Sequence, residues 1–126
     1  ERAHPLDSLT AVASVGQLRE LQEQMRSTLV SDLVREYILD LVEATRHHSE
    51  IHLGASPRAS IALFRMSQAW ALIHGREFVL PDDVKDVATA VLRHRLVPAT
   101  YFEGSGGLDR LIETLLNRVA VPGNRG

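Results

Sequence analysis

The segment from Ile61 to Ile73 is apolar around almost its whole circumference when it is placed on a helix. Its polar members are Arg65, Ser67 and Gln68. A helix of this kind has almost no side to leave in water, so neighbouring helices must cover it. We therefore predict that it lies in the middle of a helical bundle, and that Trp70 and the apolar stripe around it belong to the core.

The residues that flank this segment set the ends of the helix. Ser56 is typical of an N-cap, Pro57 of a first helical residue, and Gly75 of the residue just past the end. Arg58 then falls in the first turn, where the free N–H groups and the helix dipole already act like about half a positive charge. A cation is unfavourable there unless an anion arrives, and guanidinium binds phosphate well. The residues alone leave two interpretations open, a phosphate-binding arginine or a surface arginine paired with a glutamate.

Four further segments have helical periodicity. Ser14, with Gln17 three residues later, forms a capping-box pattern that opens a first helix. Ser31 caps a second helix, Pro81 occupies the first position of a fourth, and residues 108–119 form a last one. The sequence therefore predicts an all-α fold, a small bundle of about five helices.

Shorter segments define the rest of the organisation. Residues 51–53 and 78–80 look extended, and we predict one small β-bridge between them. Residues 1–13 show no helical periodicity and are predicted to be a linker that acts as a hinge strap. The helical domain is expected over residues 14–120, with a disordered tail over 121–126. A glycine-rich joint, Gly104 to Gly107, is expected before the last helix.

Composition excludes several classes of protein. The chain has 126 residues, of which 44% are hydrophobic and 24% charged, which suits one soluble domain with its own core. No apolar run approaches the roughly 18 residues of a membrane span. Cysteine is absent, which leaves the redox compartment open with the cytoplasm as the default. A net charge of −2 disfavours a nucleic-acid surface. Because the chain opens on Glu1, we expect it to be a fragment.

The chain lacks the motifs of the common hydrolases. A P-loop needs Gly-Lys followed by Ser or Thr, yet the only lysine, Lys85, lies in DDVKDV, and no Asp-Glu pair exists to hold magnesium. We therefore expect no ATP turnover by this chain alone. His47, His48 and His52 could be considered as zinc ligands. Adjacent histidines point about 100° apart on a helix, so we favour a solvated helix end and predict no metal site.

The string GASPRASIALFRMSQAWALIHGREFVLPDDVKDVATAVLRHRL, residues 54–96, resembles the C-terminal lid of MoxR-type AAA+ ATPases. GASPRA, a helix, the GREFVLPDDV stretch and a closing HRL follow one another in the order of that family's pattern. A less strict likeness extends backward and forward over nearly the whole chain. One departure is Leu80, where the family commonly has a capping residue such as threonine, so the capping of the fourth helix is in question.

The resemblance implies a specific role for the first motif. In AAA+ proteins an arginine of the lid, called sensor 2, reaches the γ-phosphate of ATP, and Arg58 is the matching position. The implied cofactor-binding segment is Gly54, Ala55, Ser56, Pro57 and Arg58. ATP with Mg²⁺ would bind in the full-length protein, in a pocket that this lid forms with an AAA+ core, either its own core or that of the neighbouring ring subunit. Residues 1–10 would be the hinge strap on which the lid moves.

The resemblance also implies partner proteins, and two other interpretations of the function stay open. The full-length protein is expected to form a homo-oligomeric ring, a hexamer, with a chaperone-like role toward von Willebrand factor A-domain proteins. One rival interpretation is a stand-alone helical adaptor that binds a partner protein; a nucleic-acid-binding domain is the other. The basic segment RHRL supplies a weak candidate contact, formed by Arg93, His94 and Arg95. The interpretation that we favour is the charged C-terminal end of a helix.

Overall fold

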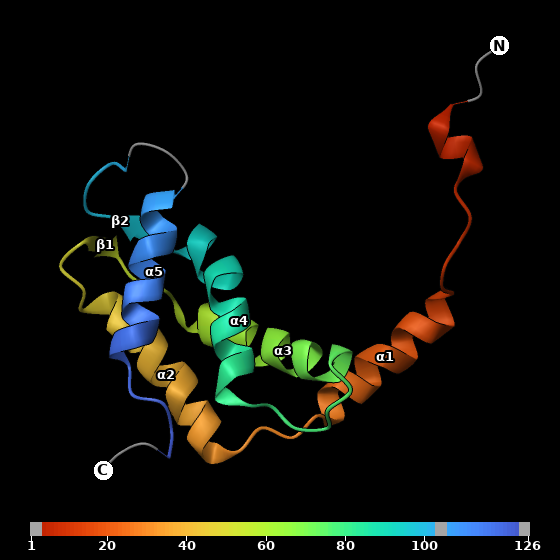
Figure 1. Cartoon of the computed structure of the whole chain (residues 1–126), viewed down its shortest axis with the longest axis horizontal. Helices are drawn as coiled ribbons and strands as arrows, with labels where there is room; N and C mark the ends of the chain where they lie inside the picture. The colour runs from red at the N-terminus through yellow and green to blue at the C-terminus, as the bar shows by residue number, and fades with distance from the viewer. Residues whose placement is uncertain (1–3, 103–105, 124–126) are drawn as a thin grey trace.

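The computed structural model describes residues 4–102 and 106–123 and confirms the predicted all-α class (Figure 1). The α-helices are α1 Val15–Ser27, α2 Asp32–Arg46, α3 Pro57–Ile73, α4 Pro81–Leu92 and α5 Gly106–Arg118. Two short 3-10 helices, η1 Pro5–Ser8 and η2 Arg93–Arg95, and two short strands, β1 Ile51–Leu53 and β2 Val97–Pro98, complete the described elements. No helix in these ranges is both long and apolar enough to cross a membrane.

The helices begin where the capping residues place them. The Ser14 hydroxyl accepts a hydrogen bond from the Gln17 N–H at 3.1 Å, and the Gln17 side chain accepts one from the Ser14 N–H at 2.8 Å. At the start of α2, the Ser31 hydroxyl accepts a hydrogen bond from the Val34 N–H at 3.3 Å, without a reciprocal bond. Helix α3 begins at Pro57 as predicted, but the side chain of Ser56 makes no capping hydrogen bond. The start of α3 is therefore fixed by other contacts.

Helix α4 is capped despite the leucine that precedes it. Asp83, only 2% exposed, accepts a hydrogen bond from the Leu80 N–H at 2.7 Å. Both of its oxygens also accept from Arg76, at 2.6 and 2.5 Å. Burial raises the pKa of Asp83, but the bonds from Arg76 and Leu80 lower it more, so that the pKa lies below its usual range. Asp83 thus supplies one half of a capping box, the bond to the N–H of the residue before the helix, while the leucine side chain supplies no cap of its own.

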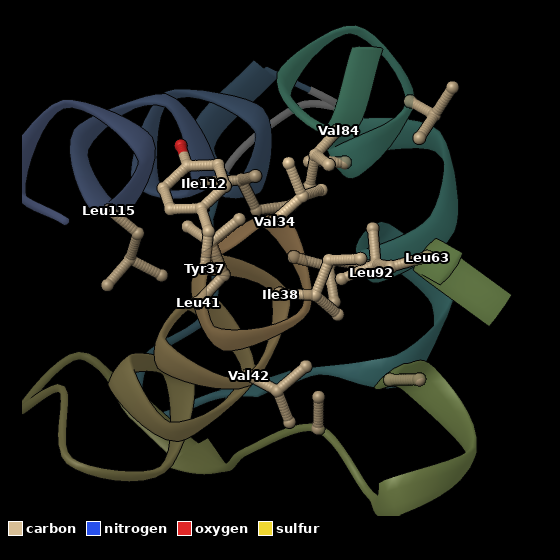
Figure 2. Close-up of a cluster of buried hydrophobic side chains, with 14 of the residues drawn as sticks. Val34, Tyr37, Ile38, Leu41, Val42, Leu63, Val84, Leu92, Ile112 and Leu115 are labelled. Carbon is tan, nitrogen blue, oxygen red and sulfur yellow. The ribbon is translucent and has the colours of Figure 1, made fainter. Parts of the chain in front are cut away.

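The core gathers around the apolar face of α2. Tyr37 is fully buried on this face, and Figure 2 draws it in one cluster with Ile112 and Leu115 of α5. Val84 and Leu92 bring α4 to the same cluster. The remaining large members that Figure 2 labels come from α2 and α3: Val34, Ile38, Leu41, Val42 and Leu63.

The prediction that α3 is covered on every side is wrong in part. Ile61, Met66 and Ile73 are 64%, 45% and 75% exposed. Trp70 is half-buried at the edge of the core, where its indole N–H donates to Asp86 at 3.1 Å. Helix α3 packs against α1, α2 and α4, and one of its apolar faces is left uncovered by the described residues.

The predicted pairing of residues 51–53 with 78–80 is also wrong. Strand β1 instead pairs antiparallel with β2, and Phe78 forms an isolated parallel bridge with Leu29. The reason is the length of α3, whose 17 residues span roughly 26 Å. Residues 51–53 lie before its first turn and residues 78–80 after its last, so each segment pairs with the chain nearest to it.

The ends of the chain are less tightly packed. Helix α1 has no buried residue and projects from the bundle toward the N-terminus (Figure 1). The predicted strap contains η1, and the predicted tail contains a turn at residues 122–123. Residues 1–3, 103–105 and 124–126 lie outside the described residues, and 104–105 of these belong to the predicted glycine joint. Helix α5 begins within that joint, at Gly106.

Candidate functional site

The loop that leads into α3 is held on the end of α2 through both backbone groups of Ala55. The Ala55 N–H donates to the Thr45 hydroxyl at 2.9 Å, and that hydroxyl donates to the carbonyl of Val42 at 2.6 Å. The Ala55 carbonyl accepts from Nε of Arg46, also at 2.9 Å. Thr45 and Ala55 are 0% and 1% exposed. Two consecutive residues of α2 therefore fix one residue of the loop.

Small residues in GASPRA are required by close packing. A Cβ atom at Gly54 would lie 2.6 Å from the Cα of Arg46, which is too short for any side chain. Ala59 is 0% exposed in the first turn of α3. Pro57, which is exposed, needs no N–H at the first helical position. Gly54 and Ala59 thus allow the loop and the first turn of α3 to pack closely. None of these three residues has a long side chain with which to contact a ligand.

Arg58 is the residue of GASPRA that has a long polar side chain, and this side chain extends into solvent. It is the second residue of α3, it is exposed, and among the described residues its guanidinium has no hydrogen bond or ion pair. The interpretation of Arg58 as a surface arginine paired with a glutamate is therefore not what the structure shows. A cation at the positive end of a helix, without a carboxylate beside it, is an arrangement that an anion would stabilise.

Arg65, on the same helix, is placed differently. Its guanidinium donates to the side chain of Gln68 at 3.1 Å and lies over the ring of Phe64, 5.6 Å from the ring centre. Arg65 is also exposed, but it has local partners and lies two turns away from the helix end. It therefore offers a matched comparison for Arg58.

The second basic segment, Arg93 to Arg95, contains one residue with a structural role and two exposed residues. Arg93 donates from Nε to Asp109 at 2.7 Å and makes a second bond to the same carboxylate, which ties η2 to α5. These bonds lower the pKa of Asp109. His94 and Arg95 are exposed. A contact with a partner could thus use His94 and Arg95, whereas Arg93 is already engaged.

The histidines near the end of α2 lie among carboxylates and backbone groups. His47 Nε2 is 2.7 Å from Glu43 Oε1, and His48 Nδ1 accepts from the N–H of Glu50 at 3.2 Å. The bond from His47 is the main cause of the lowered pKa of Glu43. Within residues 4–102 and 106–123, no group of three or more His, Cys, Asp or Glu side chains is placed to hold a metal ion.

Thr45 and Arg46 are site residues that the sequence did not single out. The periodicity of α2 shows Thr45 only as one position of the apolar face, and Arg46 as part of a basic helix end. The available signal was a hydroxyl residue on an otherwise apolar face. Such a residue, once buried, needs a hydrogen-bond partner, and here the partners are the Ala55 N–H and the Val42 carbonyl.

Comparison with known proteins identifies the family of this chain. The family described as AAA lid domain matches residues 43–115, which run from within α2 to within α5. A protein of Bacillus subtilis, the uncharacterized protein YeaC, is 36% identical over 127 residues, covering 99% of this chain and 39% of that protein. Chaperone MoxR1 of Mycobacterium tuberculosis is 34% identical, covering 88% of this chain and 32% of that one.

Two further relatives extend the comparison. Protein MoxR of Paracoccus denitrificans is 33% identical, covering 92% of this chain and 41% of that protein. The crystal structure of a candidate ATPase from Cytophaga hutchinsonii superposes with a TM-score of 0.76 at 33% identity, covering 84% of this chain and 35% of that one. The chain thus spans 32% to 41% of the length of these relatives. It belongs to the AAA lid domain family and is of the MoxR type.

Proposed function

We propose that this chain is the lid of an ATP-hydrolysing MoxR-type protein, and that Arg58 is its sensor 2 residue. The observation that supports this most directly is the exposed guanidinium of Arg58 at the N-terminus of α3, which has no hydrogen bond or ion pair within the described part of the chain and lies on a loop seated against α2. The pocket is completed by a core domain outside this chain. Bound ATP with Mg²⁺ supplies the phosphoryl group that water attacks.

In the proposed closed state, Arg58 binds the γ-phosphate and thereby draws α3 toward the nucleotide. Leu53 and Ile61, on either side of Arg58 in the sequence, are 61% and 64% exposed and would be covered by the core on closure. Once the γ-phosphate has left, Arg58 is again an unpaired cation at a helix N-terminus, which favours release of the lid. Residues 1–10 serve as the hinge.

The wider setting that we propose is supported in one respect by the name of a relative. MoxR1 of Mycobacterium tuberculosis is named a chaperone, and we propose a chaperone-like role for the full-length protein here as well. It would act in the cytoplasm as a six-membered ring, in which lid movement carries the nucleotide state from one subunit to the next. Von Willebrand factor A-domain proteins are the proposed partners, and His94 and Arg95 are candidate contacts for them.

Steady-state ATP turnover by the full-length protein tests this proposal. Loss of one preorganised charge on a transferring phosphate typically lowers the rate about 10²- to 10³-fold, so we expect Arg58→Ala to reduce kcat by about that factor. Arg65→Ala is the matched control, since it removes an exposed arginine of the same helix that has other partners. We expect it to retain the wild-type rate.

Normal turnover by both variants would contradict the sensor 2 role. The domain would then be better described as a helical adaptor, whose contacts should be sought first at His94 and Arg95. An equal loss in both variants would instead indicate general damage to α3 rather than a specific role for Arg58.

A further inference from the structure

We infer that Arg46 is the positioning residue for Arg58. This inference rests on the proposed sensor 2 role and deepens it. Arg46 is the last residue of α2, and its Nε donates to the carbonyl of Ala55 at 2.9 Å. Ala55 is three residues from Arg58, and Pro57 between them fixes the backbone angle φ near about −65°. The bond from Arg46 therefore sets the direction from which α3 and the Arg58 side chain leave the loop.

The backbone of Arg46 contributes to the same placement. The Cα of Arg46 lies 2.6 Å from the position that a Cβ atom at Gly54 would occupy. The loop thus lies directly on Arg46, with no side chain between the two main chains. A shift of the end of α2 would move Gly54 and Ala55 with it, and through them the first turn of α3.

A second hydrogen bond, from Nη1 of Arg46, holds the guanidinium in place. Its Nη1 donates to Glu43 at 3.1 Å, and Glu43 in turn contacts His47 at 2.7 Å. A planar guanidinium can bond the Ala55 carbonyl and the Glu43 carboxylate together, whereas the ammonium of a lysine is a point charge on a flexible stem. Arginine at this position is explained by that pair of bonds.

The side chain of Arg46 can be changed without opening the core. It is 39% exposed, so its removal leaves no large cavity. Thr45, which holds the Ala55 N–H, is fully buried and still anchors the loop after such a change. We therefore expect variants of Arg46 to fold and to lose the orientation of the loop rather than the bundle.

A double-mutant cycle in the full-length protein tests the inference. Small misplacements of a catalytic group can cost up to about 10²-fold in rate, so we expect Arg46→Ala to lower kcat for ATP about 10- to 100-fold. If Arg46 acts through Arg58, the same change made in Arg58→Ala should lower kcat by less than about twofold. Arg118→Ala, an exposed arginine in the last turn of α5, is the control and should leave kcat unchanged.

Two further measurements separate positioning from other roles. ADP lacks the γ-phosphate, so its Kd should stay within about twofold of wild type in Arg46→Ala and Arg58→Ala, whereas general damage would weaken ADP binding. Arg46→Lys keeps the charge and the stem but loses the Nε–H donor. We expect its kcat to be as low as that of Arg46→Ala, because charge alone does not orient Ala55.

The outcomes are distinct. Full activity in Arg46→Lys would overturn the inference in favour of a simple charge effect. Equal losses from Arg46→Ala in the wild-type and Arg58→Ala backgrounds would overturn it too, since the two residues would then act independently. Normal turnover by Arg58→Ala would remove the proposed function itself, and the inference with it. Normal turnover by Arg46→Ala, with Arg58→Ala impaired, would overturn the inference alone.

Discussion

At the scale of single residues, the residues of GASPRA are required for different physical reasons. Gly54 is required by the approach of the Arg46 backbone, and Ala59 by complete burial. Propensity rules predicted the start of α3 at Pro57 correctly. They also predicted a cap from Ser56, which makes none, because contacts from α2 hold the loop instead. Those contacts cross nine or ten residues of sequence, and local patterns do not record them.

The loss of Asp83 should lower the stability of the bundle substantially. It is buried, it bonds both nitrogens of the Arg76 fork, and it caps α4 through the Leu80 N–H. Removing one partner of a buried pair typically costs about 3–5 kcal/mol, and we expect Asp83→Ala to lower the free energy of unfolding at pH 7 by about 3 kcal/mol. Urea denaturation measures this. Asp82→Ala, whose carboxylate is 82% exposed, should cost less than about 1 kcal/mol.

The effect of pH on the stability that Asp83 and Arg76 contribute follows from the direction in which the pKa of Asp83 is shifted. The pKa of Asp83 in the folded chain lies below its usual value, which is about 3.9 in unfolded chains. Its charge therefore contributes stability that is fully present above about pH 4 and is lost as the pH falls through the folded pKa. The difference in unfolding free energy between wild type and Asp83→Ala should be constant from pH 5 to 8 in urea titrations and should shrink below about pH 4. A difference that grows in acid would contradict this assignment.

At the scale of elements, helices were predictable and strand partners were not. Helical periodicity and capping residues are local, and they placed α1, α2 and α4 closely. The β1 pairing depends on where α4 delivers residues 97–98, which is decided by packing. The exposure of Ile61 and Ile73 was likewise invisible to a pattern that counts apolar residues without knowing how many neighbours are available to cover them.

Helices α1 and α5 should differ sharply in their contribution to stability. Helix α1 has no buried residue. The free energy of unfolding of a chain that begins at Thr28 should therefore differ from that of the full chain by less than about 1 kcal/mol. It retains the Thr28 carbonyl that accepts from Gln68 at 2.8 Å. In α5, Ile112 is 0% exposed, and Ile112→Ala should cost about 2–5 kcal/mol. Urea unfolding followed by circular dichroism measures the stability of both variants. If the chain that lacks α1 is unfolded without urea, α1 belongs to the cooperative core and the prediction is wrong.

At the scale of the whole molecule, the chain supplies one wall of the site that we propose. Arg58 and the end of α3 are presented by a folded bundle, but the P-loop and acidic pair that would hold ATP and Mg²⁺ are absent from the sequence. The order of the motifs from residue 54 to 96 predicted the family, which the AAA lid domain match over residues 43–115 confirms. The positioning contacts of Thr45 and Arg46 required the structure, because they join α2 to α3 in space.

A site with one wall should bind its ligand weakly. One arginine and one helix end, without the core, should give this isolated chain a Kd for ATP no better than about 1 mM, which corresponds to about −4 kcal/mol. An NMR titration with ATP should therefore shift the amide signals of residues 56–60 without saturating at micromolar concentrations, and Arg58→Ala should abolish the shifts. Because ADP lacks the γ-phosphate but still carries two anionic phosphates, it should produce smaller shifts at the same residues. Saturation at micromolar ATP would mean that the described bundle already contains a complete nucleotide site, and the division of the pocket between lid and core would have to be abandoned.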